Sequence, residues 1–176
     1  MKSKKVAVSN SGPLIHLTVV GLLELVFKLY DVILIPQSVY NEIVVKGKEE
    51  GHSDAIILEQ AISNGKIKVE KVKTDTQKIS TPKLHQGEIN AILLALQSEV
   101  EIILLDDEEA RIFARKLKIK VKGTLGILIE LFKQKFLELE EALKYLKKIN
   151  AIMYLSSDVY CYVENKLEKI AGSTKE

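Results

Sequence analysis

Short apolar runs alternate along the chain with longer stretches in which apolar residues recur every three or four positions. The runs at 5–10, 32–35, 102–105 and 119–121 are β-branched or continuously apolar, which predicts short buried strands. The segment 67–72 alternates apolar and charged residues and predicts a half-exposed strand or an extended connection. We therefore expect a sheet of four to five strands.

The stretches between these runs have helical periodicity, and Ser53 and Thr124 are expected as helix N-caps. Strands that alternate with helices predict an α/β fold: a mostly parallel sheet with right-handed crossovers and helices on both faces. The polar segment 74–85 is expected to be a mobile loop. The helices are expected at 13–18, 22–29, 37–45, 53–64, 87–97, 108–117, 125–133, 138–149 and 157–170.

Composition narrows the class of protein. A chain of 176 residues with 47% hydrophobic residues is long enough for one folded domain, which we expect to span residues 1–176. No apolar stretch approaches the roughly 20 residues of a membrane span, and no signal peptide is predicted, so no membrane association is expected. The single cysteine, Cys161, favours a cytoplasmic protein and is expected in the core. Core packing is also expected for Tyr154, Tyr160 and Tyr162.

The overall charge gives no preference for nucleic acid, because the chain has 26 basic and 24 acidic residues. Function must then depend on where particular charges lie. An open parallel sheet binds its ligand at the carboxyl ends of the strands. Polar residues at predicted strand ends are Asn10 and Ser11 after the first strand, and Asp106 and Asp107 after the fourth.

Two interpretations of the consecutive acids remain open. Neighbouring carboxylates repel one another unless a cation lies between them, which points to a hard metal ion such as Mg²⁺. Alternatively, Asp106 or Asp107 caps the following helix, and the glutamates after it complement the helix dipole. Glu42 and Glu88 are further acids on helical segments, and each taken singly fits a solvated helix position better than a metal ligand.

Arg111 and Arg115 are four residues apart on one predicted helix, and alternate lysines follow them. Such a basic flank can neutralise an RNA backbone without reading its bases. The competing interpretation is ordinary surface pairing with Glu108 and an exposed edge strand. The histidines His16, His52 and His85 have no metal-ligand spacing.

Five short blocks of the chain occur in a characteristic order. They are VSNSGPLI at 8–15, IPQSVYNEI at 35–43, GEINAI at 87–92, LLDD at 104–107 and GTLG at 123–126. In this order they resemble the blocks of PIN-domain proteins, in particular a prokaryotic PIN-like subfamily related to VapC-type toxins. The resemblance covers residues 6–131, with two C-terminal helices expected beyond it at 138–170. It implies a three-layer α/β/α fold and an acidic site that binds Mg²⁺ or Mn²⁺ and hydrolyses RNA phosphodiesters.

The same resemblance implies the roles of individual residues. Glu42, Glu88 and Asp107 match the family's second, third and fourth acids. If the alignment is shifted by one residue, Asp106 takes the place of Asp107 as the fourth acid. Ser11 matches the neighbouring hydroxyl and is a candidate substrate contact. The basic flank, independently of the resemblance, adds Arg111 and Arg115 as candidate substrate contacts. Implied partners are RNA, an antitoxin protein and a second copy of the chain.

Asn10 departs from the family pattern, because it stands where the first aspartate is usual. Its amide oxygen can still ligate a hard cation, but the site loses one negative charge. Two functions therefore remain open. One is a metal-dependent ribonuclease of the toxin type; the other is a non-catalytic PIN-like module that binds RNA or protein.

Overall fold

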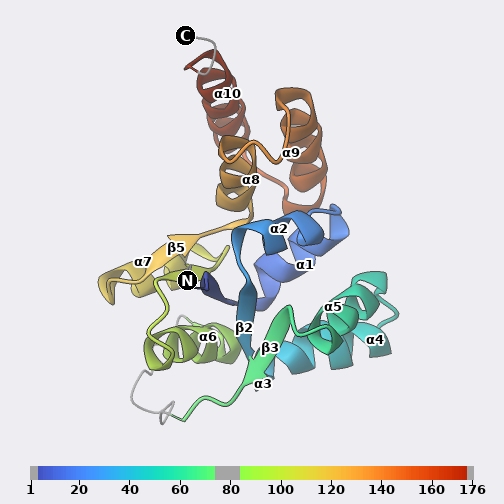
Figure 1. The fold of residues 1–176 in the computed structure, drawn as a ribbon, viewed down its shortest axis with the longest axis vertical. Helices are drawn as coiled ribbons and strands as arrows, with labels where there is room; N and C mark the ends of the chain where they lie inside the picture. The colour runs from blue at the N-terminus through green and yellow to red at the C-terminus, as the bar shows by residue number, and fades with distance from the viewer. Residues whose placement is uncertain (1–3, 74–83, 174–176) are drawn as a thin grey trace.

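A computed structural model describes residues 4–73 and 84–173 (Figure 1). Their strands form one five-stranded sheet in the order β3-β2-β1-β4-β5, and every neighbouring pair is parallel. The expected α/β fold with a parallel sheet is confirmed. The strands are β1 (Val6–Ser9), β2 (Val32–Pro36), β3 (Ile67–Glu70), β4 (Ile102–Leu104) and β5 (Lys120–Lys122).

Helices cover both faces of this sheet and make three layers. Alternate residues of β1 face opposite sides: Ala7 belongs to the core formed with α1, α2, α5 and α8, and Val8 belongs to the core formed with α6 and α7. Both side chains are fully buried, as expected for a parallel sheet covered on each face. The helices that cover the sheet are α1 (Ser11–Val19), α2 (Leu23–Leu29), α3 (Gln37–Tyr40), α4 (Gly47–Glu49), α5 (Ser53–Ser63), α6 (Gln86–Gln97), α7 (Glu108–Lys116) and α8 (Thr124–Lys133).

β1 lies at the point where the strand order changes direction. Val8 pairs with Leu34 of β2 on one side and with Ile103 of β4 on the other. The backbone N–H of Asn10 donates to the carbonyl of Leu104 over 3.1 Å, so the carboxyl ends of β1 and β4 lie side by side. In open α/β sheets this is the position at which ligands bind.

The C-terminal helices α9 (Leu139–Met153) and α10 (Ser157–Ser173) pack on α8 and on each other, and extend away from the sheet (Figure 1). Both expected helices at 138–170 are therefore present. The burial expected for three of their side chains is wrong: Tyr154 and Tyr162 are 88% and 62% exposed, and Cys161 is exposed. The reason is geometric, because α10 buries Val163 and Leu167 along one narrow stripe.

Some predicted boundaries differ from the structure. Ser53 and Thr124 are the first helical residues rather than the N-caps, which are His52 and Gly123. The helix expected at 37–45 is longer, since α3 continues through a π-helix, η1 (Asn41–Lys46), into α4. Most of the loop expected at 74–85 lies outside the described residues. No helix among the described residues has the length and apolar character needed to cross a bilayer.

Candidate active site

Asn10 follows β1 and opens α1 as its N-cap residue. Its backbone is extended, with φ −83° and ψ 176°, and its side chain does not cap the helix. Within the described part of the chain, its buried amide oxygen Oδ1 has no hydrogen-bond partner. A buried carbonyl oxygen without a donor costs about 1–3 kcal/mol, so a cation or a hydrogen-bond donor at this atom would stabilise the site.

Ser11 and Glu42 meet beside this oxygen. The Ser11 hydroxyl, in a residue only 3% exposed, donates to Glu42 Oε2 over 2.6 Å. Glu42 lies in the π-helix η1. Such wide helical turns are rare and recur at functional sites. The contact joins residues 31 positions apart and holds the Glu42 carboxylate over the end of β1.

Gly87, at the start of α6, closes the space between Asn10 and Glu42. A Cβ atom at this position would lie 3.4 Å from Asn10 Oδ1 and 3.7 Å from Glu42 Oε2. The two oxygens therefore face the same short stretch of α6 backbone, and a longer side chain at position 87 would occupy the room between them.

Glu88 brings a second carboxylate to this place. It is 6% exposed, and its Oε2 accepts a 2.9 Å hydrogen bond from the backbone N–H of His85 in a capping box at the start of α6. Burial raises the pKa of Glu88, and the negative charges of Asp107 and Glu42 raise it further, against the opposing effect of the His85 N–H. Three acids far apart in sequence thus interact at one edge of the sheet.

Asp107 contributes the third charge from the end of β4. It is the N-cap of α7, and its Oδ1 accepts a 2.9 Å hydrogen bond from the Ala110 N–H. The capping interpretation therefore holds for Asp107. Because the same carboxylate also acts on Glu88, the capping role and a place in the acidic cluster are compatible.

Asp106 faces a different set of partners. His16 Nδ1 lies 2.8 Å from its Oδ2, the Thr124 N–H donates to Oδ1 over 2.7 Å, and the Thr124 hydroxyl donates to Oδ2 over 2.7 Å. A Cβ at Gly123 would lie 2.8 Å from Asp106 Oδ1, so only glycine fits there. Asp106 ties α1, β4 and α8 together, and both its oxygens are engaged.

Sequence reasoning missed this arrangement. It treated His16 as an isolated histidine and Thr124 as a helix cap. The available signal was that position 16 lies in the helix after β1 and position 124 opens the helix after β5. Asp106 follows β4, which lies between β1 and β5 in the sheet.

Arg111 and Arg115 both lie on α7, the helix whose N-cap is Asp107. Arg111 is partly buried, and within the described residues its Nε has no partner, whereas Arg115 is exposed. Neither arginine forms an ion pair with Glu108 in the parts of the chain that the structure describes, so the surface pairing considered above is absent. The lysines beyond are engaged differently: Lys120 pairs with Glu101 over 2.9 Å.

The carboxylates are not arranged as a ready metal cage. Among residues 4–73 and 84–173, no three His, Cys, Asp or Glu side chains are grouped so that they could hold an ion. Glu42 accepts from Ser11, Glu88 accepts from His85, and Asp107 caps α7. Cation binding there would exchange some of these hydrogen bonds for metal contacts.

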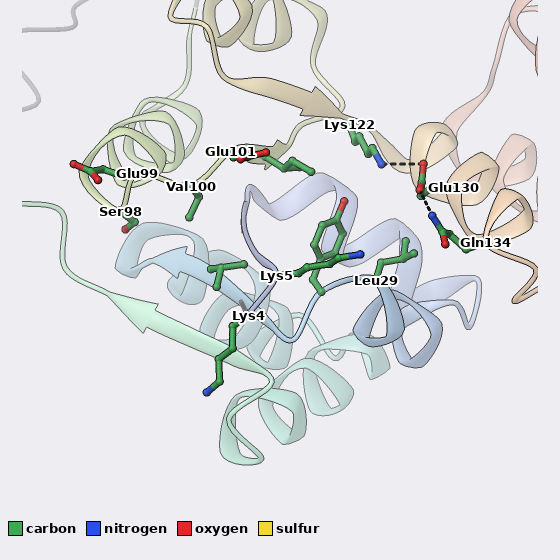
Figure 2. A pocket seen from close by; sticks show the side chains of 13 residues that line it. Lys4, Lys5, Leu29, Ser98, Glu99, Val100, Glu101, Lys122, Glu130 and Gln134 are labelled. Atoms are coloured by element: carbon green, nitrogen blue, oxygen red, sulfur yellow. Dashed lines mark hydrogen bonds and ion pairs between the residues drawn. The ribbon is translucent and has the colours of Figure 1, made fainter. Parts of the chain in front are cut away.

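A hollow of about 480 Å³ lies at the opposite edge of the sheet, where β1 and β4 begin (Figure 2). Its wall includes Tyr30. Burial and the nearby Glu130 carboxylate raise the pKa of Tyr30 to about 12. Lys122 pairs with Glu130 over 3.1 Å. Charges of both signs line this hollow, and the residues of the acidic cluster are not among its lining. The candidate site is therefore the carboxyl edge.

The fold and the acidic edge define a class: three-layer α/β/α proteins whose acids gather where β1 and β4 end. A family model described as PIN domain (DUF3368) matches residues 6–169. The chain therefore belongs to the PIN-domain family, and the match extends beyond residue 131 to include the C-terminal helices. No curated protein matches the chain.

Proposed function

We propose that this protein is a metal-dependent endoribonuclease of the PIN/VapC toxin type, which hydrolyses RNA phosphodiesters with Mg²⁺ or Mn²⁺. The observation that carries the proposal is the buried, unpartnered Asn10 Oδ1, which faces Glu42 across Gly87. Beside it, burial and like charges raise the pKa of Glu88. An oxygen without a donor and acids that repel one another both favour a bound cation.

The donor set fits a hard divalent ion. Asn10, Glu42, Glu88 and Asp107 offer only oxygen atoms, which are the ligands Mg²⁺ and Mn²⁺ prefer. We assign Asp107 to the ion rather than Asp106, because three donors already engage the oxygens of Asp106. When bound, the ion would polarise the scissile phosphate and lower the pKa of a water.

Other residues of the chain orient the site and its substrate. Ser11 fixes the Glu42 carboxylate through a 2.6 Å hydrogen bond. Arg111 and Arg115 lie on the helix that Asp107 caps, so their guanidinium groups are suited to hold the RNA backbone beside the acids. No side-chain nucleophile is required for this reaction.

A second candidate function is a non-catalytic PIN-like module that binds RNA or a protein partner. Two observations favour it. Asn10 supplies no charge, and no three acids of the described residues form a ready ion site.

Cleavage of an RNA panel in Mn²⁺ separates the two functions. We expect the wild-type protein to cut, and Glu42→Gln and Asp107→Asn each to lower the rate at least about a hundredfold, the scale expected for loss of a group that acts in the transition state. The matched control is Glu140→Gln, an exposed acid on α9 away from the site. Equal cleavage by wild type and the Glu42 and Asp107 variants would show that this site does not cut.

A homodimer and an antitoxin protein, both implied by the family resemblance, belong to the same proposal. Light scattering during size-exclusion chromatography measures the first. For the second, a bound antitoxin should inhibit cleavage in proportion to its occupancy.

A further inference from the structure

Two helices begin at the carboxyl edge beside the acidic cluster, and each begins with a glutamine. Gln37 opens α3 directly after β2, and Gln86 opens α6 directly before Gly87. Each glutamine donates to an asparagine one helical turn on: Gln37 Nε2 to Asn41 Oδ1 over 3.0 Å, and Gln86 Nε2 to Asn90 Oδ1 over 2.9 Å. In sequence, the first pair ends directly before Glu42, and the second pair lies on either side of Glu88.

A further hydrogen bond joins the pairs. Asn90 Nδ2 donates to Ser38 Oγ over 3.0 Å, which links α6 to α3. Ser38 and Glu42 are four residues apart, so they lie on neighbouring turns of one helix face. The four amides and Ser38 form a polar surface, here called the amide surface, that borders the acidic cluster.

The amide surface keeps unused hydrogen-bonding capacity. Each primary amide carries two N–H donors and a carbonyl acceptor. The bonds above use one donor of Gln37, Gln86 and Asn90, and one acceptor position of Asn41 and Asn90. Gln37, Asn41 and Gln86 are exposed. Each of these exposed side chains therefore keeps a donor or acceptor that no hydrogen bond within the described residues uses.

This surface is suited to bases rather than phosphates. The amide surface itself contains no lysine or arginine, so its own side chains offer no positive charge for neutralising a backbone phosphate. A carboxamide matches the paired donor and acceptor groups on a base edge. Such edges are accessible in single-stranded RNA, whose unstacked bases can be read directly.

We propose that the amide surface, formed by Gln37, Ser38, Asn41, Gln86 and Asn90, reads an unpaired RNA base next to the scissile phosphate. The inference rests on the proposed ribonuclease function. It adds that the amide surface gives the ribonuclease its preference for particular RNA sequences. Arg111 and Arg115 hold the backbone without reading sequence, and the amides select where along the strand the acids act.

The test compares Gln37→Ala and Gln86→Ala with wild type on a randomised single-stranded RNA pool in Mn²⁺, with the cut ends sequenced. Wild type should enrich one or two bases beside the cut. Each variant should lower that enrichment about fivefold or more, the low end for loss of a bidentate amide contact. Gln134→Ala is the matched control, because Gln134 makes the same kind of bond, 2.9 Å to Glu130, at the opposite edge of the sheet.

Binding to short homopolymers of each base, measured by fluorescence anisotropy in EDTA, separates this inference from the proposed function. Suppose that no cleavage is seen, but that wild type binds the homopolymers with different affinities and the two variants reduce those differences. That result overturns only the nuclease proposal. The base-reading inference is wrong if wild type shows no base preference in either assay, or if both variants keep it. Circular dichroism verifies that the exposed substitutions leave the fold unchanged.

Discussion

Asn10 is the residue on which the proposed metal chemistry depends. It keeps an oxygen at the end of β1 but brings no charge, and that oxygen is buried without a partner in the described structure. Negative charge is still present next to this uncharged amide, because Glu42 lies beside Asn10 and interacts with Glu88. Local conflicts of this kind are expected at functional sites.

Asn10→Asp should tighten Mn²⁺ binding at least about tenfold, because an added carboxylate attracts the ion at short range. Without metal, the same substitution should lower the melting temperature, since a further negative charge would lie near Glu42 and Glu88. Isothermal titration calorimetry and thermal unfolding with and without Mn²⁺ measure both effects. Identical affinities for the two proteins would place the ion elsewhere.

The raised pKa of Glu88 predicts a pH dependence of stability in metal-free protein. The folded state holds this proton more tightly than the unfolded state does. The free energy of unfolding should therefore fall as pH rises from the ordinary value of 4.5 through the raised pKa, and then level off.

Glu88→Gln should remove that fall. Below the ordinary pKa the wild type and the variant should keep a constant difference in stability, and above it the variant should gain on the wild type. Urea unfolding across the pH range in EDTA measures the difference. Parallel profiles for the two proteins would contradict the raised pKa.

At the scale of elements, the candidate site is an assembly of helix beginnings. α1, α6, α7 and α8 all start at the carboxyl edge, and their N-terminal N–H groups carry partial positive charge. These dipoles favour the clustered carboxylates and also explain why Glu88 and Asp107 occupy capping positions. Helix capping and acid placement therefore come from the same side chains.

Substitutions at Asp107 should separate these two roles. Asparagine is as good an N-cap as aspartate, whereas alanine costs about 1 kcal/mol. We expect Asp107→Asn to unfold at the wild-type urea concentration and Asp107→Ala to be less stable by that amount, while both lose cleavage. If the asparagine variant were fully active, Asp107 would be a cap alone.

The link through Asp106 gives an independent prediction for the fold. Thr124 is fully buried, and its hydroxyl donates to Asp106. Thr124→Val should lower the free energy of unfolding by about 1–3 kcal/mol, because the partner carboxylate loses a donor. Thr124→Ser keeps the hydroxyl and should stay within about 1 kcal/mol of wild type by the same measurement.

For the whole molecule, the charge is nearly balanced, so the proposed binding of RNA must depend on local groups. The net charge is +2 over 176 residues, so long-range steering is weak. The exposed arginine of α7 lies on the helix that carries Asp107, while α9 and α10 extend away from the sheet (Figure 1).

Arg115→Ala should weaken RNA binding uniformly across sequences and reduce the slope of log affinity against log salt by about 0.7, the value for one phosphate of a single strand. The control is Lys147→Ala, which removes an exposed charge on α9 and should leave the slope unchanged. Fluorescence anisotropy over a range of salt concentrations measures both. An equal slope for wild type and Arg115→Ala would remove this arginine from the interface.

Much of the fold followed from local patterns in the sequence. The apolar runs at 32–35 and 102–105 and the helical periodicity at 87–97 are local signals, and the structure has β2, β4 and α6 there. Errors arose where burial depended on neighbours: Tyr162 and Cys161 are apolar enough for a core but face away from it. Helix periodicity alone does not say which stripe meets the rest of the molecule.

The sequence by itself determined the class of fold, the strand ends that carry Asn10 and the paired aspartates, and the neutral residue among the acids. Only the tertiary structure decided that Asp106 binds Thr124 and His16 while Asp107 acts on Glu88, and that Glu42 accepts from Ser11. The physical reason is that strand and helix formation depend on residues a few positions apart. The contacts of the site join residues 18 to 90 positions apart, which only the packed sheet brings together.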